Sequence, residues 1–146
     1  MSDDSREKKI AEHIQKDPVA SMLNASVEIL SPGHSRASMT VTEAMCNFHG
    51  TIHGGLIFTL GDMAFGAASN SHGRTSVAMN MNINFIRAPK PGDSLVAEAV
   101  EQHRGGKTAL YDITVTQADS GKLIARIEGR VYQMDEWFVP ASDSGD

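Results

Sequence analysis

The sequence predicts an α+β domain in which one antiparallel sheet of about six strands wraps round one long central helix. Apolar and polar residues alternate in six separate segments, which is the pattern of half-buried strands. A single segment, residues 54–71, has the length and apolar spacing of a long helix. Glycine, proline and aspartate residues separate the last four alternating segments, as hairpin turns require.

The chain begins with a predicted short helix over residues 1–17. Asp4 and Glu7 have the spacing of a capping box, and the Asp17-Pro18 pair marks the end of the helix. Between them, three apolar residues recur at helical spacing: Ile10, Ala11 and Ile14.

A predicted hairpin follows, with strands over 23–29 and 37–41 and a turn at Pro32-Gly33. An irregular stretch over 43–53 leads into the long helix, for which His72-Gly73 supplies a glycine stop. Four further strands are predicted: 76–87, 94–104, 107–117 and 122–134. We therefore expect a single domain over 18–139 and a flexible tail over 140–146.

Composition excludes several classes of function. The 146 residues include 13 Lys and Arg against 18 Asp and Glu, a net charge of -5, which disfavours binding to a nucleic acid backbone. The single cysteine, Cys46, forms no internal disulfide and no thiolate zinc site, so we expect no metal. The sequence has neither a secretory signal nor a run of about 20 apolar residues, which favours a cytoplasmic protein without membrane contact.

The long helix has two apolar faces on a helical wheel. One face is expected to pack on the sheet, and the opposite row, which carries a carboxylate among aromatic rings, is expected to face away from it. Exposed rings on adjacent turns favour cover by a second copy of the chain, a homodimer. The alternative is that the carboxylate is an ordinary surface group. The sheet-facing row is Leu56, Leu60, Met63, Ala64 and Ala67, and the opposite row is Phe58, Asp62, Phe65 and Ser69.

The loop over 47–55 enters this helix with two adjacent glycines. A helix N-terminus presents unpaired N–H groups, and Gly54 and Gly55 there let a carbonyl oxygen approach the backbone, as in an oxyanion hole. The alternative is that the two glycines only permit the start of the helix to pack tightly against the sheet. His49 and His53 are four residues apart, but the glycines around them disfavour a helical metal pair.

Two further sets of residues are candidates for ligand contact. Amides alternate along the strand over 76–87 at Asn80, Asn82 and Asn84, where a hydrogen-bond set for a partner strand is the alternative. Positively charged side chains at the ends of neighbouring strands favour binding of a phosphorylated ligand. The alternative is that they are ordinary surface charges at the solvent-exposed rim of the sheet. These cations are Arg87, Lys90, Arg104 and Lys107.

The sequence resembles the hotdog-fold acyl-CoA thioesterases, in the branch from bacterial phenylacetic acid degradation, over about residues 17–134. The matching residues are Asn47, Gly50, His53, Gly54, Gly55, Leu60, Asp62, Ala64 and Phe65, followed by Asn84, Phe85 and Arg87. Gly61 departs from the alanine frequent in relatives, and we expect it to loosen the helix by up to ~1 kcal/mol.

The resemblance implies a site and an activity. Asp62 would act as nucleophile or general base, the N–H of Gly55 would polarise the thioester carbonyl, His53 and Gly54 would shape the approach, and Asn47 would act across a dimer interface. Further substrate contacts are expected from Phe58, Phe65, Asn84, Arg87, Arg104 and Lys107.

The resemblance also implies two sites between the subunits of an edge-to-edge homodimer, commonly doubled to a tetramer. The expected substrate is an aryl-acyl-CoA such as phenylacetyl-CoA or a ring-hydroxylated derivative, with no cofactor beyond the coenzyme A of the substrate. A hotdog dehydratase or hydratase and a noncatalytic acyl-CoA binding module are the alternatives. A hotdog dehydratase or hydratase usually has a histidine beside its catalytic carboxylic acid, and the long helix has no histidine at a matching turn.

Overall fold

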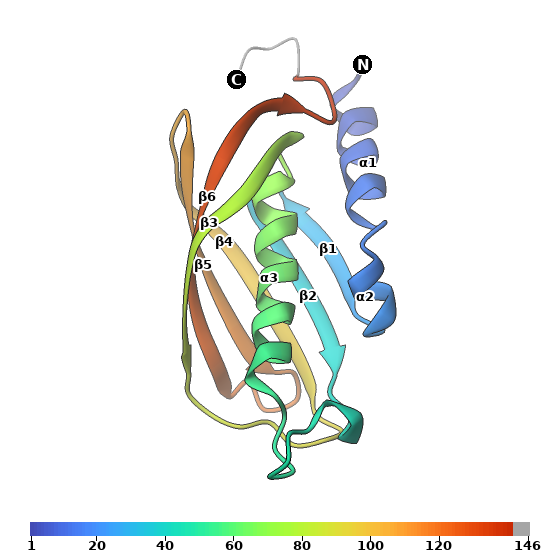
Figure 1. Ribbon diagram of the computed structural model, residues 1–146. Coiled ribbons are helices and arrows are strands. Elements are labelled where there is room, and N and C mark those ends of the chain that lie inside the picture. The colour runs from blue at the N-terminus through green and yellow to red at the C-terminus, as the bar shows by residue number, and fades with distance from the viewer. Residues whose placement is uncertain (142–146) are drawn as a thin grey trace.

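The computed structural model describes residues 1–141 and confirms the predicted α+β architecture, a six-stranded antiparallel sheet curved round one long helix (Figure 1). Of the predicted tail, residues 142–146 lie outside this range. The elements are α1 (Asp3–Ile14), α2 (Pro18–Met22), β1 (Ser26–Ser31), β2 (His34–Thr40), a short 3-10 helix η1 (Glu43–Met45), α3 (Gly54–Asn70), β3 (Arg74–Phe85), β4 (Ser94–Arg104), β5 (Thr108–Gln117) and β6 (Leu123–Trp137).

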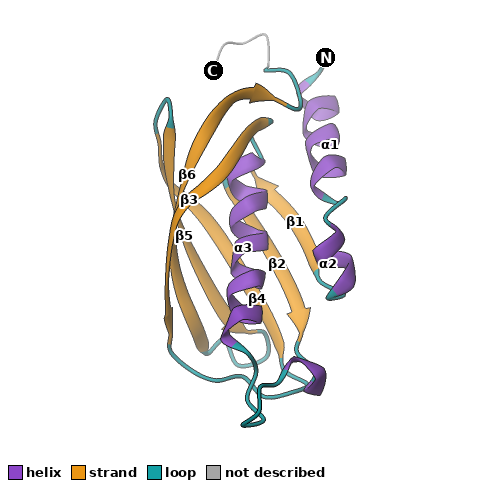
Figure 2. Ribbon diagram, in the orientation of Figure 1, coloured by secondary structure: helices purple, strands orange, loops and turns teal. Residues whose placement is uncertain are grey.

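The strands are ordered β1-β2-β4-β5-β6-β3, with antiparallel pairing throughout. The α3 helix lies in the concave side of the sheet, and α1 and α2 lie beside β1 (Figure 2). The outer strands β1 and β3 each pair with one neighbour only among the described residues. One long edge of the sheet, β3, is therefore available to another strand.

The N-terminal segment differs from the prediction in two details. The α1 helix is capped by Ser2, whose hydroxyl accepts a 3.2 Å hydrogen bond from the N–H of Ser5, rather than by Asp4. Asp17 does not end the helical region, because its carboxylate caps the additional helix α2. The β1 strand consequently begins later than predicted, after Asn24 reverses the chain with a φ of 53°.

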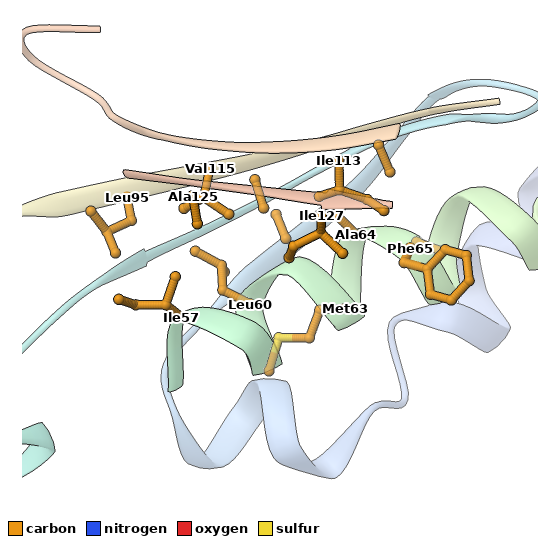
Figure 3. Packing of buried hydrophobic residues seen from close by; sticks show 14 of the residues in the cluster. Ile57, Leu60, Met63, Ala64, Phe65, Leu95, Ile113, Val115, Ala125 and Ile127 are labelled. Atoms are coloured by element: carbon orange, nitrogen blue, oxygen red, sulfur yellow. The ribbon is translucent and has the colours of Figure 1, made fainter. Parts of the chain in front are cut away.

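The core joins α3 to the sheet. Leu60 and Ala64 are fully buried and lie toward residues of the central strands, including Ile113 and Val115 (Figure 3). Gly61 faces β6, where a Cβ atom would collide with the Cδ1 methyl of Ile127. The glycine therefore brings the helix closer to the sheet than alanine would, a packing role that its low helix propensity did not indicate.

The prediction that Phe65 faces away from the sheet is wrong. Phe65 is only 1% exposed, its ring meets the ring of Tyr111 edge-on with centroids 5.7 Å apart, and it lies over Gly129 of β6. The curved sheet, together with α1 and α2, covers more than one face of α3, so the wheel underestimated the buried arc. Phe58 is half-buried. Uncovered rings on α3 are therefore not an argument for a dimer.

Candidate active site

The two glycines at the start of α3 have different surroundings. A Cβ on Gly54 would lie 3.0 Å from Cζ of Phe85, so packing accounts for this glycine. A Cβ on Gly55 would meet nothing within 4 Å, and Gly55 is exposed. In the first turn, the N–H of Leu56 donates to the carbonyl of His53 at 3.1 Å, whereas the N–H of Gly55 has no acceptor among the described residues. Gly55 thus combines an N–H that makes no hydrogen bond among the described residues with open space at its Cβ position, so no side chain crowds a carbonyl oxygen there.

The loop before α3 is fixed by Asn47. Its Oδ1 accepts hydrogen bonds from the backbone N–H of His49 (2.9 Å) and from both the N–H and the hydroxyl of Thr51 (3.2 and 3.0 Å). The N–H of His53 donates to the carbonyl of Met45 at 2.9 Å, which anchors the residue before Gly54. The side-chain oxygen of Asn47 is therefore committed to the loop, and its amide nitrogen is the end that can serve a ligand.

The outward row of α3 carries small and polar residues. Gly55 and Asp62 are exposed, and Thr59 and Gly66 between and beyond them are half-exposed. These four residues follow the i, i+4, i+7, i+11 spacing of one helix ridge. The hydroxyl of Thr59 donates to the carbonyl of Gly55 at 2.8 Å. The carboxylate and the open N–H thus share one face of the helix, roughly 10 Å apart along its axis.

Asp62 lies in a hollow of about 600 Å³ between α3, the N-terminal helices and the start of β3. We call it the α3 hollow. Although Asp62 is exposed, the walls of the hollow keep part of the solvent from its carboxyl group. This desolvation raises the pKa of the carboxyl above its ordinary value, and the negative charge of Asp17 raises it further. A raised pKa makes the carboxylate a stronger base. The lining of the α3 hollow includes His13, Asp17, Asp62, Phe65, Asn70 and Ser76.

Asp17 and the other residues opposite Asp62 were not predicted as part of a site. The sequence assigned Asp17 only to the end of a helix. In the structure its carboxylate accepts hydrogen bonds from the N–H groups of Val19 and Ala20, so an aspartate before proline was a local signal for the start of a second helix. Nothing in the spacing of residues indicated that α1 and α2 line a hollow together with the outward face of α3. That placement depends on contacts far apart in the chain.

The predicted group of cations is divided between two ends of the sheet. Arg87 donates to the carbonyl of Leu123 at the start of β6, near the N-terminus of α3. Arg104 donates to Gln133, ten residues further along β6, which is about 33 Å away. Lys107, whose carbonyl accepts from the N–H of Gln133, lies at this second end. Antiparallel pairing reverses alternate strands, so the prediction that these cations form one group is wrong within a chain.

Asn84 is directed away from α3. Its neighbours Ile83 and Phe85 belong to the face toward the helix, where Phe85 contacts Gly54. Side chains alternate along a strand, so Asn84 points to the opposite face. There it lines a second hollow of about 430 Å³ with Asp112, Arg126 and Glu128 among others. Asn84 therefore does not meet Asp62 within one chain.

Comparison with known proteins shows the family. Residues 49–124 match the family model described as the thioesterase superfamily. The acyl-coenzyme A thioesterase PaaI of Escherichia coli is 35% identical over 120 residues, which cover 82% of this chain and 85% of that protein. Human acyl-coenzyme A thioesterase 13 is 33% identical over 98 residues, 66% of this chain and 70% of that one.

Solved structures agree. The Escherichia coli PaaI structure superimposes with a TM-score of 0.86 at 32% identity, covering 91% of this chain and 96% of that one. A Streptococcus mutans protein bound to acetyl CoA gives a TM-score of 0.72 at 30% identity, over 76% and 89% of the two chains. The fold is that of the hotdog acyl-CoA thioesterases. The chain belongs to the thioesterase superfamily, as the sequence resemblance predicted. Along the described residues, no helix is long and apolar enough to cross a membrane.

Proposed function

We propose that the chain hydrolyses an aryl-acyl-CoA, phenylacetyl-CoA or a ring-hydroxylated derivative, to the free acid and coenzyme A in aromatic acid catabolism. The observation that carries this proposal is the carboxylate of Asp62 in the α3 hollow, on a helix whose start offers the N–H of Gly55 without a hydrogen-bond partner among the described residues. The similarity to PaaI, named an acyl-coenzyme A thioesterase and solved as a protein of the phenylacetic acid degradation operon, supports the substrate class.

In the proposed reaction, the ionised Asp62 attacks the thioester carbonyl or removes a proton from an attacking water. Negative charge develops on the carbonyl oxygen, where the Gly55 N–H stabilises it. The C–S bond then breaks and the departing coenzyme A thiolate takes up a proton. Where water is the nucleophile, this leaves the free acid. Where Asp62 is the nucleophile, it leaves an acyl–Asp62 anhydride, which water then hydrolyses to the free acid and the restored carboxylate. His53 and Gly54 shape the approach to this N–H, and the amide nitrogen of Asn47 holds the thioester or the water.

We further propose that two chains build each site. Gly55 and Asp62 of one helix are roughly 10 Å apart, whereas groups that act on one carbonyl lie about 3 Å from it. A site between Gly55 of one protomer and Asp62 of the other removes this conflict. Support comes from β3, an outer strand in which the consecutive residues 77–80 are all exposed. Its exposed apolar side chains include Val77 (48%), Met79 (54%) and Phe85 (53%).

Exposed apolar side chains along an open edge favour pairing with a second β3 strand. The homodimer, doubled to a tetramer as the family resemblance implies, is tested by sedimentation at micromolar concentration. Dimers or larger assemblies are expected, and a monomer would contradict the shared site. In such an assembly, Arg87 of one chain and Arg104 or Lys107 of another are the candidates for the coenzyme A phosphates.

The activity is tested by release of free thiol from a panel of acyl-CoAs. We expect release from phenylacetyl-CoA and its hydroxylated derivatives, faster than from benzoyl-CoA and medium-chain acyl-CoAs. A hotdog dehydratase or hydratase would change the acyl group without releasing thiol, and a binding module would retain the substrate unchanged. Either result would replace hydrolysis as the function.

A further inference from the structure

The lining of the α3 hollow includes, beside the end of α3 that is distant from Gly55, a buried hydroxyl group without a hydrogen-bond partner. Ser76, near the start of β3, is 9% exposed, and its hydroxyl is the one buried side-chain polar atom within residues 1–141 that makes no hydrogen bond. Ser76 lines the same hollow as Asp62. A buried hydroxyl without a partner is unfavourable, so this group is suited to a bond with something that enters the hollow.

Ser76 is held rigidly by Asn70 at the end of α3. The N–H of Ser76 donates to Oδ1 of Asn70 at 2.9 Å, and Nδ2 of Asn70 donates back to the carbonyl of Ser76 at 3.1 Å. Both backbone groups of Ser76 are thus satisfied, and only its hydroxyl is left. The neighbouring hydroxyl of Ser69 differs, because it donates to the carbonyl of Gly66 at 3.3 Å.

The axial separation between Asp62 and Asn70, the residue that holds Ser76, suits one ring. Asn70, which holds Ser76, lies eight residues beyond Asp62 on α3, or about 12 Å along the axis. Attack at the carbonyl takes about 3 Å of this, and a hydrogen bond at the other end about 3 Å more, which leaves about 6 Å. The walls between are partly apolar, with contributions from Met63, Phe65 and Val131.

We propose that Ser76 determines specificity by hydrogen bonding to a polar substituent at the far end of the acyl group. The preferred acyl group is then an apolar, ring-sized body with a hydroxyl opposite the thioester. This inference rests on the proposed function and adds to it the residue that distinguishes a hydroxylated from an unsubstituted aryl-acyl-CoA.

The test compares kcat/KM for phenylacetyl-CoA with kcat/KM for its meta-hydroxy and para-hydroxy derivatives. The wild-type protein is expected to favour one hydroxylated substrate by at least about 5-fold, the worth of one neutral hydrogen bond. In Ser76→Ala this preference should disappear, through a higher KM for the hydroxylated substrate and with phenylacetyl-CoA unaffected. Ser69→Ala, which removes a hydroxyl already bonded within the fold, should keep the wild-type preference.

Thermal unfolding gives a second readout. Removing an unpartnered buried hydroxyl should raise the Tm of Ser76→Ala or leave it unchanged. A preference that persists in Ser76→Ala, or equal hydrolysis of all three substrates by the wild-type protein, would overturn the inference and leave the hydrolase intact. A clear fall in Tm would also overturn it, because the hydroxyl would then serve the fold. Failure to hydrolyse any of the three would instead remove the proposed function itself.

Discussion

Gly55→Ala is expected to make the protein more stable and less active. The added Cβ meets no atom within 4 Å, so the fold accommodates it without strain. Alanine is favoured over glycine in a helix by about 0.5–1 kcal/mol. For a chain of this length the gain corresponds to a rise in Tm of about 1–4 °C. The same methyl group is expected to crowd a carbonyl that approaches the N–H of Gly55, and loss of one such donor lowers kcat by about 10²-fold to 10³-fold.

The assay pairs thermal unfolding with free-thiol release from phenylacetyl-CoA. Gly106→Ala is the matched control, since a Cβ there also meets nothing within 4 Å but lies in the turn between β4 and β5. The control should keep the wild-type kcat. A Gly55→Ala variant with wild-type kcat would refute the assignment of this N–H to the carbonyl. A lower Tm would refute the account of the helix start.

Three more predictions address the site and its support. Asp17→Asn keeps a good N-cap for α2 but removes a negative charge that raises the pKa of Asp62. The acidic limb of the pH profile of kcat/KM should therefore move to lower pH. A limb that does not move would show that the two carboxylates do not interact. Gly129→Ala places a Cβ 2.8 Å from two ring atoms of Phe65 and should cost about 1–3 kcal/mol in the free energy of unfolding by denaturant, with an unchanged midpoint contradicting this packing. Arg87→Ala should raise KM for an acyl-CoA more than for a short thioester without the nucleotide; equal rises would mean that Arg87 does not contact the phosphates.

Local pattern predicted the elements of this fold well. The alternation over 94–104 gave the bounds of β4 without error, and the glycine-rich turns placed the other strands within a few residues. The long helix begins at Gly54 as predicted and ends one residue early, at Asn70. The spacing of apolar residues and the residue types that form turns depend on neighbouring residues only, so they can be read directly from the sequence.

Residues that meet through the tertiary structure were harder to predict. The helical wheel predicted one row toward the sheet and the opposite row toward a second chain, but the curved sheet buries Phe65 as well as Leu60. Cations at successive strand ends were expected together, although antiparallel pairing places Arg87 and Arg104 at opposite ends. Gly55 and Asp62 share an exposed face, and their catalytic roles remain predictions.

The most direct test of the catalytic assignment is the kcat of Asp62→Asn with phenylacetyl-CoA. The amide keeps nearly the same volume, but it can neither attack a carbonyl nor accept a proton from water. Because burial and Asp17 disfavour the charge at position 62, the neutral variant should unfold at the wild-type Tm or above it at neutral pH. We predict a loss of about 10²-fold to 10⁴-fold in kcat with substrate still bound. A variant that retains more than about a tenth of the wild-type kcat would show that Asp62 is not the catalytic carboxylate.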